Sequence, residues 1–367
     1  MSKKKARQRA RVSIGAAKPT LKQLAERVGL SQTTVSLVMN GAEAAIGISA
    51  DTRERILAAA REINYRPSFL ARSLRTGRSY MIGVMVPAIT EGYNVGVLGG
   101  IEEHLVKAGY LHITVSHHFR SELVQRYSAT FLDRSVDGVI SACGPWDTEL
   151  PVPAVTISSY PSTKNTPSVI LDHQAAAELG MRHLYDLGHR KIAVMKGVDF
   201  VPDAKIRWET IKQFASTLGV AISPKLAMPI EASQFPNTTP RNGYTATKKL
   251  LASGEPFTAI FAFNDVSAIS AMRALSEAGL RVPEDISVIG FDDIESAAYQ
   301  TLGLTTIRQP LRKMGSIAAE TLIRRIEASK AELEGIPIKI VVAPELVVRE
   351  TSGPARTVNT KQRFRRG

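Results

Sequence analysis

The chain has 367 residues, a hydrophobic content of 44% and a formal charge of +13. This length predicts two domains of ordinary size with a small module. No apolar run approaches the ~18–20 residues needed to cross a bilayer, which excludes a membrane-spanning protein.

The charge is unevenly placed along the chain. Residues 1–78 hold 16 Lys/Arg against 5 Asp/Glu (+11), and residues 349–367 hold 6 against 1 (+5), so residues 79–348 carry 13 − 11 − 5 = −3. A slightly acidic body with one strongly basic end is typical of proteins that bind the phosphate backbone of nucleic acid. No Trp/Phe-rich amphipathic face accompanies the charge, so we expect no membrane partner.

Residues 1–19 are rich in Lys, Arg and Ala without periodicity, and we expect a disordered basic arm there. No apolar segment follows, so the arm is not a secretory signal; an arginine-rich transit peptide is the alternative. Cys143 is the single cysteine, so no intramolecular disulfide can form, which suits a reducing cytosol. We therefore expect a cytoplasmic protein.

Residues 20–66 predict a small three-helix module. Thr20 and Gln23 form a capping box that begins the first helix, and Gly29 ends it. The inward face of this helix follows the spacing i, i+3, i+4, i+7: Leu21, Leu24, Ala25 and Val28. A third helix over Ser49–Ile63 completes the core, with inward residues Ile56, Leu57, Ala60 and Ile63.

The second helix is the candidate DNA reader. Ser31 caps it after a gap of about three residues, which fits a helix-turn-helix. Val35, Val38 and Met39 point inward, which leaves outside a row of mostly small polar residues: Gln32, Thr33, Ser36 and Leu37. Short polar side chains on the first turn of a helix are suited to reading base edges in a groove.

A short fourth helix is predicted between Pro67, which can begin it, and Gly77, which can end it. With about eight residues it is too short to be stable alone. It carries Leu70 and Leu74 beside arginines, so we expect it to form against a symmetry mate or DNA. A solvated linker is the alternative.

After Arg78 short apolar runs alternate with helical patterns, which predicts parallel sheets covered by helices on both faces. The expected strands are Met81–Val86, Leu111–Val115, Gly138–Ser141, Ala154–Ser158, Ser168–Leu171, Lys191–Met195, Ala259–Phe263 and Ser287–Phe291. The expected helices are Asn94–Ala108, Glu122–Arg134, Gln174–Leu187, Ile206–Leu218, Gly243–Ser253, Val266–Ala278 and Leu311–Glu327. Ligands of such sheets bind at the carboxyl ends of strands.

Catalytic motifs are absent from the sequence: it has no Gly-x-Ser-x-Gly, His-Glu-x-x-His, Walker run or Gly-x-Gly-x-x-Gly. Cys143 has no activating partner in sequence, and the pair His117–His118 supplies too few ligands for a metal. We therefore expect no enzyme activity, no catalytic residue, no bound metal and no cofactor.

Three segments together resemble the LacI/GalR family of bacterial transcription regulators: TLKQLAERVGLSQTTVSLVMNG, DTRERILAAAREINYRPSFLARSLRTG and IGVMVP. The resemblance extends from Thr20 to Glu350. It implies an N-terminal all-α helix-turn-helix domain over residues 20–66 and a hinge helix or linker over 67–78. It further implies an α/β core over 79–350, similar to periplasmic sugar-binding proteins, with two parallel-sheet subdomains.

The resemblance also implies the subdomain boundaries. The first subdomain would comprise about 79–171 and 309–332, and the second about 172–308 and 333–350, with a ligand cleft between them. We expect residues 351–367 to be a basic disordered tail. No leucine heptad follows Glu350, so a homodimer is expected rather than a tetramer joined by a coiled coil.

By the same resemblance, DNA contacts are carried over residue by residue. Gln32, Thr33 and Ser36 would face bases, and phosphates would be held mainly by Ser31, Thr34, Asn40 and Arg53. Leu74 would be a wedge in the minor groove, and the remaining DNA contacts would come from Thr20, Ala71 and Arg72. Leu37 stands where many members carry a polar reader, and the loop Gly41–Ile48 is about three residues longer than usual.

The resemblance also implies six effector contacts. Arg207 lies in a segment resembling the family's Arg-x-x-Gly signature, with Thr210 in place of the glycine. Asn264 and Asp292 end strands, where the alternative for each is a helix cap. The resemblance adds Gln309, Tyr93 and Asn94, the last two in EGYNVGVLGGIE.

The resemblance implies a repressor that binds palindromic operator DNA and is controlled by a small effector, a sugar or sugar derivative. One alternative keeps the DNA module with a purine or protein corepressor. Another is a solute-binding transport component.

Overall fold

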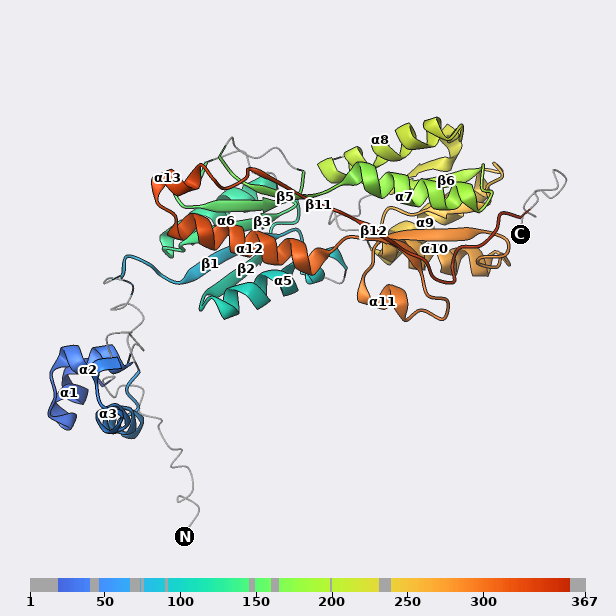
Figure 1. The fold of residues 1–367 in the computed structure, drawn as a ribbon. Helices are drawn as coiled ribbons and strands as arrows, with labels where there is room; N and C mark the ends of the chain where they lie inside the picture. The colour runs from blue at the N-terminus through green and yellow to red at the C-terminus, as the bar shows by residue number, and fades with distance from the viewer. Residues whose placement is uncertain are drawn as a thin grey trace, which may run out of the picture. The chain divides into compact units, whose positions relative to one another are not determined.

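The structure is a computed structural model. It describes residues 19–39, 46–66, 73, 76–89, 92–144, 149–159, 165–198, 200–230 and 239–356 (Figure 1). The chain divides into two compact units, Met1–Ser79 and Tyr80–Gly367. In the described part of the chain, no helix combines the length and the apolar character that crossing a membrane requires.

The first unit contains three helices: α1 (Leu21–Val28), α2 (Gln32–Met39) and α3 (Ala50–Glu62). The predicted capping box at Thr20 is present, and Gly29 ends α1 in the left-handed conformation with φ +68°. Leu24, Val35 and Ile56 are fully buried and form the centre of this small core. The predicted boundaries of the helix-turn-helix are therefore correct to within a residue.

Two predictions about side chains of this unit were wrong. Leu57, expected inside, is 38% exposed, and Ala59 is buried in its place. At 100° per residue Leu57 turns away from the face that carries Ile56 and Ala60. Leu37 was expected outside, but it is partly buried and packs against the core of this unit.

Several predicted segments lie outside the described residues: the arm over 1–18, the loop residues Asn40–Ala45, most of the hinge over 67–75, and the tail from 357. Within the hinge, Ser73 and Thr76 have helical conformation, and Gly77 adopts φ +66° with its N–H donating to the Ser73 carbonyl. Gly77 thus has the conformation typical of a residue that ends a helix.

The second unit contains two six-stranded sheets in separate lobes. The first sheet has the order β11-β5-β4-β3-β1-β2 and is parallel throughout. Its strands are β1 (Met81–Val86), β2 (Leu111–Ser116), β3 (Gly138–Ala142), β4 (Ala154–Ile157), β5 (Ser168–Leu171) and β11 (Lys339–Val342). We call this sheet and its helices the first lobe.

The second lobe is built on a sheet of order β12-β10-β9-β8-β6-β7. Its strands are β6 (Ile192–Lys196), β7 (Ala227–Pro229), β8 (Ala259–Phe261), β9 (Ser287–Asp292), β10 (Thr305–Arg308) and β12 (Glu345–Val347). β12 runs antiparallel to β10, so the prediction of parallel strands fails at this edge. β7, β10, β11 and β12 were not predicted.

Helices cover both faces of each sheet (Figure 1). In the first lobe α5 (Tyr93–Lys107) and α12 (Leu311–Glu327) share one face and α6 (Ser121–Asp133) covers the other; α13 (Lys330–Leu333) follows. In the second lobe α9 (Pro240–Ala252) and α10 (Asp265–Glu277) lie opposite α7 (His173–Asp186) and α8 (Pro202–Thr217). A short α11 (Glu295–Ala298) and a 3-10 turn (Pro224–Leu226) complete it.

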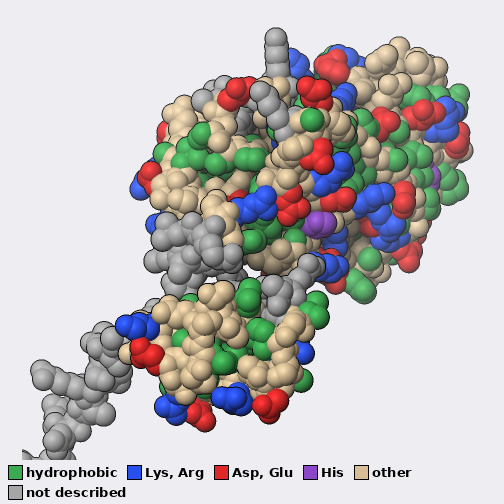
Figure 2. Space-filling view, turned by 60° about the vertical axis from the view of Figure 1, so that its left-hand side comes forward, with side chains coloured by type: hydrophobic (Ala, Val, Ile, Leu, Met, Phe, Trp, Pro, Cys, Tyr) green, Lys and Arg blue, Asp and Glu red, His purple; other side chains and the backbone are tan. Residues whose placement is uncertain are grey.

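The surface of the second unit carries both signs of charge. Acidic and basic side chains are interspersed over the face that Figure 2 presents. This distribution fits the small net charge of residues 79–348, whereas a large field of one sign would be needed to attract DNA phosphates.

The chain passes between the lobes three times. The first passage follows β5 and the second follows β10, near the expected positions Asp172 and Gln309. The third lies after Val342, not at residue 333 as expected, because β11 pairs with β5 and belongs to the first lobe.

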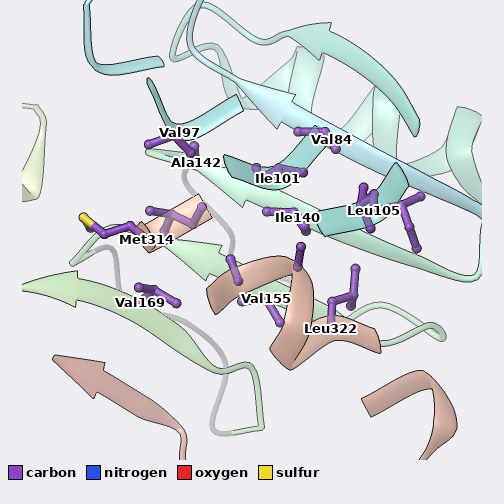
Figure 3. Packing of buried hydrophobic residues seen from close by; sticks show 14 of the residues in the cluster. Val84, Val97, Ile101, Leu105, Ile140, Ala142, Val155, Val169, Met314 and Leu322 are labelled. Carbon is purple, nitrogen blue, oxygen red and sulfur yellow. The ribbon is translucent and has the colours of Figure 1, made fainter. Parts of the chain in front are cut away.

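The helices α5 and α12 approach very closely over the core of the first lobe, which includes Val97, Ile101 and Met314 (Figure 3). Glycines make this approach possible. A Cβ on Gly315 would lie 2.1 Å from the Val97 carbonyl oxygen, and one on Gly100 would lie 1.9 Å from the Arg312 carbonyl oxygen. The backbones could not remain at this separation with any larger residue at either position.

We expect Gly315→Ala to lower the free energy of unfolding by about 1–3 kcal/mol, because the two helices must separate to admit the methyl group. Urea unfolding followed by circular dichroism measures it. Gly335→Ala is the matched control, since its Cβ would meet Glu332 at an ordinary 3.5 Å. Equal stability of the two variants would contradict the close-packing argument.

His117 is a buried link at the end of β2. Its Nδ1 accepts from the Phe119 N–H at 3.1 Å, so its Nε2 carries the proton and donates to the Ala142 carbonyl at 3.1 Å. Burial lowers the pKa of His117 to about 4. In the unfolded chain His117 has a pKa of about 6.5, so between pH 6.5 and pH 4 its side chain is protonated in the unfolded state and neutral in the folded state. The free energy of unfolding therefore falls as the pH falls towards 4.

The variant His117→Gln lacks this titration. From pH 7 to pH 4 its free energy of unfolding should improve relative to wild type by roughly 3 kcal/mol, since each pKa unit is worth 1.36 kcal/mol. Urea unfolding of both proteins across that pH range measures the difference between their free energies of unfolding. The titrations of all other groups are common to both proteins and cancel in this difference. A difference that does not change with pH would show that His117 does not titrate as described.

Candidate functional site

A cavity of about 130 Å³ lies at the carboxyl ends of the parallel strands, with walls from both lobes. All six expected effector residues line it: Tyr93, Asn94, Arg207, Asn264, Asp292 and Gln309. They are brought together because α5 begins beside β1, while β8, β9 and β10 all end at the same edge of the second sheet. This is where open α/β sheets bind ligands.

Asp292 and Arg207 form the charged centre of the cavity. Asp292, at the end of β9, is 5% exposed and adopts φ +115°, a strained conformation for a residue with a side chain. The Gln309 amide donates to its carboxylate at 2.5 Å. Burial raises the pKa of Asp292 to about 6, although Arg207 and Gln309 act to lower it.

The Arg207 guanidinium, 6% exposed, lies against two aromatic rings. Its Cζ is 3.5 Å from the centre of the Phe291 ring and 4.9 Å from that of Phe263. One terminal nitrogen donates to the Phe263 carbonyl at 2.6 Å. Burial lowers the pKa of Arg207, and the nearby carboxylates Asp292 and Asp203 oppose that shift.

Asn264 is a helix cap that also lines the cavity. Its Oδ1 caps α10 by accepting from the Ser267 N–H at 3.0 Å. The neighbouring Asp265 is fully buried, accepting from Thr306 and from the Ile294 N–H, and burial raises its pKa to about 8. Asp293 pairs with Arg308 and Arg349, both at 2.7 Å.

The first lobe contributes Tyr93 and Asn94 from the first turn of α5, together with Cys143 after β3. Tyr93 and Cys143 both line the cavity. Burial raises the pKa of both side chains, so the thiol at neutral pH is protonated and a poor nucleophile. The described residues contain no group of three His, Cys, Asp or Glu side chains able to hold a metal ion.

Residue-by-residue reasoning missed a buried pair in the cavity wall, His173 and Asp203. The His173 Nε2 lies 3.0 Å from the Asp203 carboxylate, which also accepts from the Ser159 N–H at 3.1 Å. Ser159 follows β4 of the first lobe, whereas Asp203 begins α8 of the second, so this bond joins the lobes. The sequence signals that could have identified these residues are their positions at helix starts, beside Asp172 and Pro202.

In the first unit, the residues expected to face DNA differ in their exposure to solvent. The Ser31 hydroxyl accepts from the Thr34 N–H and lies 2.9 Å from the Thr34 hydroxyl, so both act in the cap of α2. Gln32 and Thr33 are exposed, as are Thr20 and Arg53, and Ser36 is half-buried. Asn40, Ala71, Arg72 and Leu74 lie outside the described residues.

Comparison with known proteins agrees with this arrangement. Residues 20–68 match the model of bacterial regulatory proteins of the lacI family, and residues 181–352 match that of the periplasmic binding protein-like domain. The HTH-type transcriptional repressor PurR of Pasteurella multocida is 32% identical over 341 residues, 90% of this chain and 98% of that protein. The ribose operon repressor of Haemophilus influenzae is 30% identical over 338 residues, with the same coverage of both chains.

Among solved structures, the lac repressor dimer bound to operator and the anti-inducer ONPF superimposes with a TM-score of 0.76. It is 28% identical and covers 92% of this chain and 100% of its own. Identity above 30% over nearly the whole of curated repressors, with both family matches in the expected order, settles the classification. The chain belongs to the lacI family of bacterial regulatory proteins and is a DNA-binding transcriptional regulator.

Proposed function

We propose that this chain represses transcription as a homodimer on a palindromic operator and is switched by a neutral carbohydrate of one ring. The observation that carries this proposal is the convergence of all six expected effector residues on the walls of one cavity. The DNA module supplies the output, and the cavity supplies the signal.

The walls of the cavity suit a polyhydroxylated ring. A hydroxyl both donates and accepts, so it can bond the carboxylate of Asp292 and the guanidinium of Arg207 alike. Tyr93, Phe119 and Phe263 add aromatic surface for the apolar face of a ring. A cavity of ~150 Å³ holds a molecule the size of benzene, so the observed volume favours one ring over two.

The dimer is supported by exposed apolar side chains on the first lobe. Val95 and Val106 of α5 are 51% and 65% exposed, and Leu111 on the edge strand β2 is 63% exposed. Val95 and Val106 are eleven residues apart, about three helical turns, so they share a face of α5. A two-fold contact requires a self-complementary patch, and we infer that these side chains belong to one.

Control of DNA binding follows from the two-lobed construction. A ligand that binds both walls changes the angle between the lobes, and the first lobe is joined through Tyr80 to the hinge segment over 67–78. A short helix there is marginal without a partner, so a small change in the spacing of two such hinges alters operator affinity. The coupling expected is on the order of 1–3 kcal/mol.

We predict that Gln32→Ala and Thr33→Ala each weaken binding to the selected operator by about 1–3 kcal/mol, because each removes a contact to a base edge. The operator is first selected from random duplex DNA by the full-length protein, and a palindromic, salt-sensitive site is expected. Thr217→Ala, an exposed threonine on α8, is the matched control. Failure to enrich any palindrome would contradict the proposed operator.

Asp292→Asn should abolish the effector response while leaving operator binding intact, because the amide cannot accept as a carboxylate does. Thermal shift with D-ribose, D-glucose, D-galactose and hypoxanthine identifies the ligand class, and operator titration with and without that ligand measures the response. Val348→Ala, exposed on the second lobe, is the control. If hypoxanthine alone raised the melting temperature, the effector would be a purine corepressor and the carbohydrate proposal would be wrong.

A further inference from the structure

Three polar atoms of the cavity-lining residues are buried and make no hydrogen bond with any described residue: His173 Nδ1, Asn94 Oδ1 and Arg207 Nε. Buried polar atoms in folded proteins are almost always hydrogen-bonded. His173 and Arg207 are each 6% exposed, so open solvent does not satisfy them. These atoms therefore mark the contacts that a bound effector completes.

The partner of His173 determines what its unbonded nitrogen offers. Asp203 is in the first turn of α8, where the helix N-terminus favours a carboxylate. Burial opposes ionisation of Asp203, but hydrogen bonds from His173 and Ser159 outweigh it and lower its pKa. A carboxylate can only accept, so His173 Nε2 carries the proton, and Nδ1 holds a lone pair when the ring is in its neutral form.

We propose that His173, positioned by Asp203, is an effector-specificity residue whose Nδ1 accepts a hydrogen bond from a hydroxyl or N–H group of a neutral effector. Asn94 Oδ1 accepts a second such bond, and Arg207 Nε donates to an effector oxygen. This assignment rests on the proposed function, because it places the effector in that cavity.

The charged side chains that line the cavity determine which effectors bind weakly. Asp203 and Asp292 are two carboxylates opposed by the single guanidinium of Arg207 among the described lining residues. A phosphate or carboxylate on the effector would add negative charge to a wall that already carries a net negative charge, at low dielectric. A neutral polyol avoids this repulsion and still donates to every acceptor. The site therefore selects a neutral sugar over its phosphorylated form.

The tautomer is tested first, without any ligand. In the full chain labelled with 15N-histidine, long-range 1H–15N spectra at pH 7 distinguish protonated from bare ring nitrogens, and His173→Gln assigns the resonance among the seven histidines. We expect Nε2 protonated and Nδ1 bare in the wild type. Asp203→Asn should mix the two tautomers, because an amide both donates and accepts, whereas the exposed Asp133→Asn should not. A protonated Nδ1 in the wild type would overturn the proposal.

The contact is tested with D-ribose and D-ribose 5-phosphate, and with any other sugar that raises the melting temperature. The bound neutral sugar should shift the His173 Nδ1 resonance, and the phosphate should bind at least tenfold more weakly. His173→Phe should weaken sugar binding by about ten- to a hundredfold, and His173→Gln by less because it keeps an acceptor. An unmoved Nδ1 with sugar bound, or tighter binding of the phosphate, would overturn the proposal. If no sugar binds, the proposed function is contradicted in its choice of a carbohydrate effector. The tautomer spectra still decide whether His173 Nδ1 can accept a hydrogen bond.

Discussion

A guanidinium charge buried at the floor of the cleft is the constraint on which the second unit depends. Removing such a charge from water is expensive unless it is compensated by nearby acceptors and opposite charge. Arg207 receives this compensation from the Phe263 carbonyl, the face of Phe291, and the carboxylates Asp203 and Asp292. Because these groups stand at the ends of β8 and β9 and the start of α8, the sheet and α8 must keep their mutual positions for the charge to be tolerated.

The compensation is incomplete, and in the proposed function this incompleteness serves recognition of the effector. Arg207 Nε, His173 Nδ1 and Asn94 Oδ1 remain without partners among the described residues, on two lobes joined by the Ser159–Asp203 hydrogen bond. A ligand that satisfies these atoms binds both lobes at once and so favours one angle between them. The strained φ of Asp292 belongs to the same site, as expected where function holds a backbone in a costly conformation.

Much of the fold could be predicted from residue patterns because its signals are local. Strands of five or six apolar residues, such as Met81–Val86, and helices with caps, such as that begun by Thr20, were placed almost to the residue. The failures have a common cause. β11 and β12 have four and three residues and half-exposed patterns, so their lobes are decided by pairing with β5 and β10, from which they lie far apart in sequence.

The sequence by itself determined the two-part organisation, the helix-turn-helix and six residues that line the cavity, since caps, periodicity and family motifs are written in adjacent positions. Only the tertiary structure decided which polar atoms stay unsatisfied there. His173 and Asp203 lie 30 residues apart, and their pairing requires α7 and α8 to begin at the same edge of one sheet. Whether a side chain caps a helix, pairs with a neighbour or faces a ligand depends on that convergence, because a hydrogen bond is made over about 3 Å of space whatever the separation in sequence.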